Sequence, residues 1–168
     1  SLMQIGDLFE KWGLISLKVK TPILEMNWEP ADADKDAAWD LYVELLTRIS
    51  TQRLPDDHGI EGAALDSIYS LFPLTRTTLK DHGRKAIGFS RIAIIILNQV
   101  VRPFTSKWHR LANQGAFNDA TQCSAFRADL FILQAELRKY TRLLADLASV
   151  EDLTQMDAEA EASYYQDI

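Results

Sequence analysis

The chain has 168 residues, of which 47% are hydrophobic and 25% charged, and its formal net charge at pH 7 is −6. These values are close to the averages of soluble globular proteins, and a chain of this length buries a core without a metal or disulfide. Cys123 is the only cysteine, and the N-terminus lacks the basic and apolar runs of a signal peptide, so we expect a cytoplasmic protein.

The N-terminal region predicts one short helix followed by an extended arm. Residues 3–12 place Ile5, Leu8, Phe9 and Trp12 on one side of a helix. In residues 13–21 apolar residues then alternate with lysines until a proline ends the pattern. This segment has no obvious strand partner, and we expect an arm that lies across the rest of the fold.

A second helix is expected to start near Asp34, after Pro30 and a run of aspartates that favour helix starts. Residues 53–61 contain Pro, Asp and Gly and predict a loop. The apolar face of this second helix is predicted to consist of residues at spacings of three and four: Trp39, Tyr42, Leu46 and Ile49.

The third helix should point Leu65, Ile68 and Phe72 inward. Pro73 should end or kink it, because proline lacks a backbone donor and clashes with the preceding turn. A short continuation is expected to stop at Gly83.

The fourth helix is expected to begin near Arg84. Residues 92–97 are apolar on every side, which is typical of a helix surrounded by others. The apolar window of residues 92–101 is too short to span a bilayer, which needs about 20 residues. Pro103 should bend or break this helix and leave residues 104–111 as a separate short helix before a loop at 113–118.

The fifth helix carries the clearest pattern. Asp119 with Gln122 matches a capping box in type. Heptad spacing then follows at Phe126, Leu130, Leu133, Leu137, Tyr140, Leu144 and Leu147. We therefore predict an all-α fold, an up-and-down bundle of four long helices with a short N-terminal helix and an extended N-terminal arm. Residues 1–150 would form one domain and residues 151–168 an acidic C-terminal tail.

Charge is segregated along the chain. Residues 25–66 carry a net charge of −8, residues 76–110 a net charge of +7, and residues 146–168 a net charge of −7. One interpretation is that basic and acidic helices pair inside the bundle. The other is that residues 76–110 form a positive surface that receives a phosphate-bearing ligand or an acidic protein.

Most catalytic patterns are absent from the sequence. It has no glycine-rich phosphate loop and no zinc-binding spacing, and we expect neither a metal nor a cofactor. Asp36, Asp40 and Glu44 share a helical face that we interpret as solvated, and Asp57-His58-Gly59 as a turn. Cys123 is interpreted as a structural thiol.

Residues 102–110 contain most of the candidate binding and proton-transfer residues of the chain. Arg102, Lys107 and Arg110 could bind phosphate, Trp108 could stack on a base, and His109 could transfer protons near neutral pH. These residues are candidates for an anion or nucleic-acid site. The alternative is that Phe104 and Trp108 pack at the end of the bundle while the charged groups face water.

Six residues separate Arg102 from His109, and this spacing resembles the Arg-x4–6-His motif of the HEPN family. Those proteins are small helical bundles, often dimeric, and many cut RNA. The resemblance implies that His109 would activate a ribose hydroxyl while Arg102 stabilises the phosphate charge. Pro103 departs from the pattern, because a polar residue commonly follows the arginine, and Arg76 with His82 forms a second match.

The function that we predict first is a non-catalytic helical module that binds another macromolecule, most simply a protein, through the basic residues 76–110 and the acidic tail. The alternatives are a HEPN-like metal-independent ribonuclease that uses Arg102 and His109, and a structural subunit that lines nucleic acid in a larger complex. RNA and a second copy of the chain are the other expected partners, and no membrane is involved.

Overall fold

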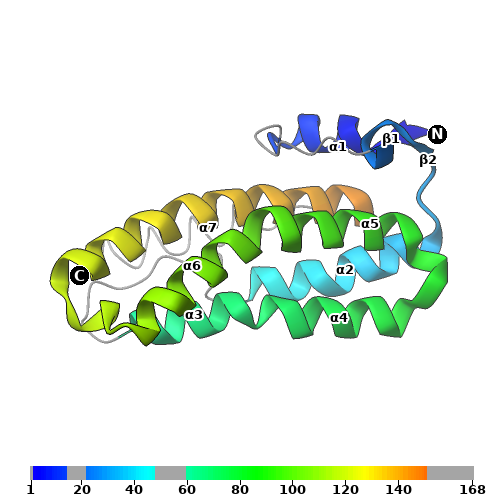
Figure 1. The fold of residues 1–168 in the computed structure, drawn as a ribbon. Coiled ribbons are helices and arrows are strands. Elements are labelled where there is room, and N and C mark those ends of the chain that lie inside the picture. The colour runs from blue at the N-terminus through cyan, green and yellow to red at the C-terminus, as the bar shows by residue number, and fades with distance from the viewer. Residues whose placement is uncertain (1, 15–21, 48–59, 151–168) are drawn as a thin grey trace, which may run out of the picture.

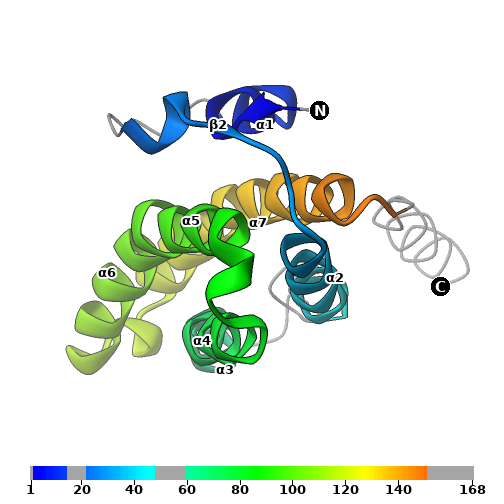
Figure 2. The ribbon, with the colours of Figure 1, turned by 90° about the vertical axis from the view of Figure 1, so that its right-hand side faces the viewer.

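The structure is a computed structural model of the chain, and it describes residues 2–14, 22–47 and 60–150. Helices dominate it, and four helical rods alternate in direction as an up-and-down bundle (Figure 1), which confirms the all-α prediction. The rods are α2 (Asp32–Leu46), α3 (Glu61–Tyr69) with α4 (Leu71–His82), α5 (Ile87–Ile96) with α6 (Arg102–Asn113), and α7 (Ala120–Ala148). Seen along the bundle, the rods surround a common core, and the N-terminal elements lie against one side (Figure 2).

The longest helix, α7, follows the heptad pattern predicted for it. All seven heptad residues are buried, and α7 makes its most extensive packing against α2. Its start is fixed by Asp119, whose side chain accepts a hydrogen bond from the backbone N–H of Gln122 at 3.1 Å. The fifth predicted helix is therefore confirmed in both its extent and its buried face.

The second predicted helix forms, but its buried face is rotated from the prediction. Trp39 is 43% exposed, whereas the core side of α2 consists of Asp34, Ala37, Ala38, Leu41, Tyr42 and Leu45. Asp34 is buried because it accepts two backbone hydrogen bonds, from Ala31 at 2.9 Å and from Phe89 of α5 at 2.9 Å. One carboxylate thus caps α2 and also satisfies a donor in the first turn of α5.

Pro73 interrupts the third rod without turning it. The α-helix is interrupted at Ser70, between α3 and α4, while the chain keeps its direction (Figure 1). Leu65, Ile68 and Phe72 point inward as predicted. The rod ends at Gly83, whose φ of 65° lies in the region that favours glycine, and the turn η2 (Gly83–Ala86) leads into α5.

Pro103 was predicted to bend or break the fourth rod, and the rod does divide near it into two α-helices, although it stays helical throughout. A π-helical turn, η3 (Leu97–Val101), precedes Pro103, and α6 begins at Arg102, where the proline falls in the first turn. A proline is tolerated there because the first N–H groups of a helix have no partner in it. The rod is also less enclosed than predicted, since Ile94 is 48% exposed.

The N-terminal elements form a small layer on the bundle. The strand β1 (Met3–Gln4) pairs antiparallel with β2 (Asn27–Trp28), a pairing that the sequence did not predict. Between them lie α1 (Ile5–Lys11) and the 3-10 turn η1 (Pro22–Glu25). The buried residues of α1 are Ile5, Leu8 and Phe9, as predicted.

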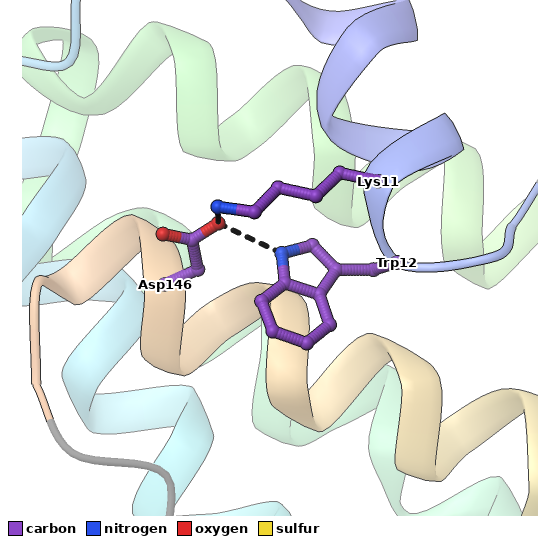
Figure 3. Close-up of polar contacts among 3 residues, drawn as sticks. All are labelled: Lys11, Trp12 and Asp146. Carbon is purple, nitrogen blue, oxygen red and sulfur yellow. Dashed lines mark hydrogen bonds and ion pairs between the residues drawn. The ribbon is translucent and has the colours of Figure 1, made fainter.

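One carboxylate ties this layer to the end of α7. Asp146 accepts hydrogen bonds from Nζ of Lys11 at 2.9 Å and from Nε1 of Trp12 at 2.8 Å (Figure 3). Both donors lie at the C-terminal end of α1, so these two hydrogen bonds hold that end of α1 against α7.

Trp28 packs so closely on α5 that only glycine fits beneath it. A Cβ atom on Gly88 would overlap the indole ring of Trp28. We expect Gly88→Ala to lower the free energy of unfolding by about 1–3 kcal/mol, the usual cost of overpacking. Gly62, in α3, has open space around its Cβ position, so Gly62→Ala should raise stability by about 0.5–1 kcal/mol. Urea unfolding of both variants checks this, and a stabilising Gly88→Ala would contradict the packing.

Several predictions lie outside the described residues: the alternating pattern at Leu17 and Val19, the inward position of Ile49, the loop at 53–59 and the tail at 151–168. Within the helical residues Glu61–Asn113, one window of mean hydropathy 1.3 passes a length and composition test for a membrane span. Of that window, 44% is buried inside the bundle.

Candidate functional site

All five predicted site residues lie on α6, but the helix separates them onto different faces. Arg102 and His109 are seven residues apart, so they share a face about two turns, or ~10 Å, from each other. Lys107, Trp108 and Arg110 point in other directions around the helix. The predicted cluster is therefore divided into separate environments.

Arg102 and His109 each lie against an aromatic ring of the third rod. The Arg102 guanidinium lies 4.8 Å from the Phe72 ring centroid, and its Nε donates to Oδ1 of Asn98 at 3.2 Å. The His109 ring meets the Tyr69 ring edge-on at 5.0 Å, and Tyr69 is 5.6 Å from Phe72. These four side chains form a ladder that joins α6 to α3 and α4, and the structure does not bring Arg102 and His109 to one point.

Trp108 is not available to stack on a base. It is 1% exposed, and its ring lies 5.2 Å from Phe126 and 6.2 Å from Phe117. Phe104 is also buried, 5.5 Å from Phe126. The nucleic-acid role predicted for Trp108 is therefore corrected by its burial, because both faces of the indole are enclosed by the bundle.

An ion pair links Lys107 of α6 to Asp129 of α7. Their Nζ and Oδ2 atoms are 2.7 Å apart, and Nε1 of Trp108 donates to the same oxygen at 3.0 Å. A buried indole N–H needs a partner, and Asp129 supplies it. Lys107 is thus paired within the bundle, while Arg110 is exposed.

An open groove of about 380 Å³ lies between the fourth rod and α7. Its polar lining residues are Gln99, Lys107, Asp129 and Glu136, and its apolar lining residues are Val100, Pro103, Phe104, Ile132 and Leu133. The π-helical turn η3 contributes Gln99 and Val100, and such turns occur often at functional sites. We call this feature the α6–α7 groove.

Two large apolar side chains are exposed on α7, and one of them lines this groove. Phe131 is 70% exposed and Ile132, which lines the groove, is 64% exposed. They fall between the heptad positions Leu130 and Leu133, which fill the core. Successive residues of a helix point about 100° apart, so Phe131 and Ile132 face different directions, and of the two only Ile132 lines the groove.

The wall of the groove also holds a carboxylate that is only half paired. Oε1 of Glu136 accepts a hydrogen bond from Nζ of Lys139 at 2.9 Å. Oε2 is buried and has no hydrogen-bond partner among the described residues. A carboxylate oxygen in this state favours an additional donor.

The structure divides the basic stretch between paired and exposed side chains. Nε2 of His82 lies 2.6 Å from Oδ2 of Asp40, and this contact joins α4 to α2. Within the described part of the chain, other cations of the stretch face solvent: Arg76, Lys80, Arg84, Lys85 and Arg110. No group of three or more metal-ligating side chains is assembled among the described residues.

Cys123 lies in the first turn of α7 and is partly buried. Its Sγ donates to the carbonyl of Phe117 at 3.4 Å. Burial, followed by the charge of Glu61, raises the pKa of this thiol above its ordinary value. A raised pKa disfavours the nucleophilic thiolate, in agreement with a structural role.

Sequence reasoning missed the α6–α7 groove altogether. Its walls come from two rods that are about thirty positions apart in the chain, and no spacing rule joins them. The available signal was the run from Leu130 to Leu133, which holds more apolar residues than one seam of a bundle uses.

No protein-family model, curated protein or solved structure matches this chain.

Proposed function

We propose that the chain is a non-catalytic helical interaction module that binds a helical segment of a partner protein in the α6–α7 groove. The observation that carries the proposal is the 64% exposure of Ile132 in a groove whose other apolar residues are Val100, Pro103, Phe104 and Leu133. Exposed apolar patches beside a groove are typical of protein interaction sites, and amphipathic helices bind by laying their apolar face into such grooves. The module would act in the cytoplasm, where its single cysteine stays reduced.

The positions of the candidate catalytic groups favour binding over chemistry. Arg102 and His109 lie about two turns apart, and each contacts an aromatic ring. Trp108 and Lys107 bind Asp129 and so contribute to the packing of α6 on α7. The groove, in contrast, is open and is lined by both apolar and polar side chains.

A fluorescent amphipathic helical peptide made of leucine and glutamine tests the proposal. We expect it to bind the protein, and Ile132→Asp should weaken binding about tenfold or more, because a charge would then occupy the apolar wall. Ile94→Asp is the matched control: Ile94 is 48% exposed on α5 and does not line the groove. Fluorescence anisotropy measures both affinities. Absence of binding, or equal losses in the two variants, would contradict the proposal.

RNA cleavage is the second candidate, favoured by one observation: Arg102 and His109 share a face of α6, where His109 contacts the half-exposed Tyr69 and Arg102 contacts Phe72. We expect the protein to leave mixed-sequence RNA intact at low salt with chelator present, because the two side chains are too far apart to act on one phosphate in a single chain. Cleavage that His109→Ala abolishes would replace the first proposal. Salt-sensitive binding without cleavage would favour a nucleic-acid-lining role for the exposed cations.

A further inference from the structure

The α7 side of the groove carries two carboxylates, and they differ in the hydrogen-bond partners that they have. Asp129 and Glu136 are seven residues apart on α7 and both line the groove. Asp129 already accepts hydrogen bonds from Lys107 at 2.7 Å and from Trp108 at 3.0 Å. Oε2 of Glu136 is buried without a partner among the described residues. The Glu136 side chain as a whole is 20% exposed, so this oxygen meets an incoming donor when the side chain turns toward the groove.

The surroundings of that oxygen determine which donor fits it. An apolar surface lies beside Glu136 in the groove and consists of Val100, Ile132 and Leu133. A side chain that donates to Glu136 must therefore pack along this apolar surface. Lysine and arginine do this well, because their aliphatic stems pack on apolar surface while the charged head stays polar. A hydrogen bond from a cation to a carboxylate is also stronger than one between neutral groups.

We infer that the helix that binds in the α6–α7 groove is basic, and that one of its lysine or arginine side chains donates to Oε2 of Glu136. This inference rests on the proposed function, since it assigns chemistry to the partner of the same groove. The partner helix presents an apolar face to Val100, Ile132 and Leu133 and places its cation next to that face. The net charge of −6 on this chain also attracts such a partner over long range.

A second copy of the chain fits this groove less well. The exposed apolar residues of α7, Phe131 and Ile132, lie on the same helix as Asp129 and Glu136. Two copies that met through this surface of α7 would bring like charges together, and apposed carboxylates oppose association. A basic helix from another protein supplies the complementary charge without this repulsion.

Three peptides of one apolar pattern test the inference, with lysine, glutamine or glutamate at the polar positions. We expect the leucine–lysine peptide to bind most tightly and the leucine–glutamate peptide most weakly. Glu136→Gln should weaken binding of the leucine–lysine peptide about tenfold, because a charged hydrogen bond is lost. The same variant should change the affinity for the leucine–glutamine peptide little. Asp66→Asn removes the same charge from an exposed site on α3 and should change affinity less than twofold.

The outcomes separate this inference from the proposed function. If the lysine and glutamine peptides bind the groove equally, the groove remains a protein site but the basic partner is wrong. If Glu136→Gln and Asp66→Asn weaken binding of the leucine–lysine peptide equally, the protein prefers this peptide only because of its net charge. That result would overturn the contact with Oε2. If no peptide binds, both proposals fail. Analytical ultracentrifugation measures the oligomeric state. A dimer that Ile132→Asp dissociates would assign the groove to a second copy of the chain and overturn the inference.

Discussion

Replacing Trp108 with alanine is expected to lower the free energy of unfolding by about 3–5 kcal/mol, the range for large buried aromatic residues. The side chain is 1% exposed and joins the rings of Phe104, Phe117 and Phe126 in one cluster. Its removal leaves a cavity and also takes a hydrogen bond from Asp129. Urea unfolding followed by circular dichroism measures the loss.

Two further variants serve as controls for that result. Arg110→Ala, at an exposed position of the same helix, should change stability by less than about 0.5 kcal/mol. Trp108→Phe keeps an aromatic ring but loses the N–H donor, so its effect should fall between those of the two alanine variants. A stable Trp108→Ala protein with weakened RNA binding would instead favour a stacking role and contradict the buried position.

Asp34→Ala is expected to cost about 3 kcal/mol of stability. The carboxylate is 1% exposed and accepts backbone hydrogen bonds from Ala31 and Phe89, at 2.9 Å each. Alanine leaves both donors without this acceptor, and hydrogen bonds to a charged group contribute about 1.5–3 kcal/mol each. The variant loosens the junction of α2 and α5, and chemical denaturation measures the change.

Asp32→Ala provides the matched control, because Asp32 lies exposed in the first turn of the same helix. Its effect should stay below about 1 kcal/mol, the size of an interaction with the helix dipole. Asp34→Asn retains one acceptor oxygen and should be less harmful than Asp34→Ala. Equal effects of Asp32→Ala and Asp34→Ala would show that Asp34 is no more than a surface charge.

The sequence predicts α7 well because local and global preferences agree there. The apolar residues from Phe126 to Leu147 keep a strict heptad spacing, and Asp119 stands at the one position where its side chain can cap the helix. Neither feature depends on distant residues. The burial of this face and the up-and-down arrangement follow from the pattern alone.

The face of α2 was misassigned for a physical reason. Its core side contains the small residues Ala37 and Ala38 and the polar Asp34, which carry little weight in a hydrophobic pattern, while the large Trp39 is largely exposed. Asp34 is buried because a donor in another helix, the N–H of Phe89, needs it. That need becomes visible only when α2 and α5 are in place.

The candidate site was predicted in part. Residues 102–110 do form a helix at the end of the bundle, and Phe104 and Trp108 pack inside it as the structural interpretation of that segment proposed. The groove could not be predicted, because it depends on the π-helical turn before Pro103 and on the contact of two distant rods. Tertiary packing decides both features.

Intermolecular NOEs between the leucine methyl groups of the leucine–lysine peptide and methyl-labelled protein test the proposed groove most directly. The account predicts NOEs to Val100, Ile132 and Leu133, which line the groove. NOEs confined to Ile87 and Ile94, the exposed apolar residues of α5, would contradict it and move the binding surface to another face of the bundle.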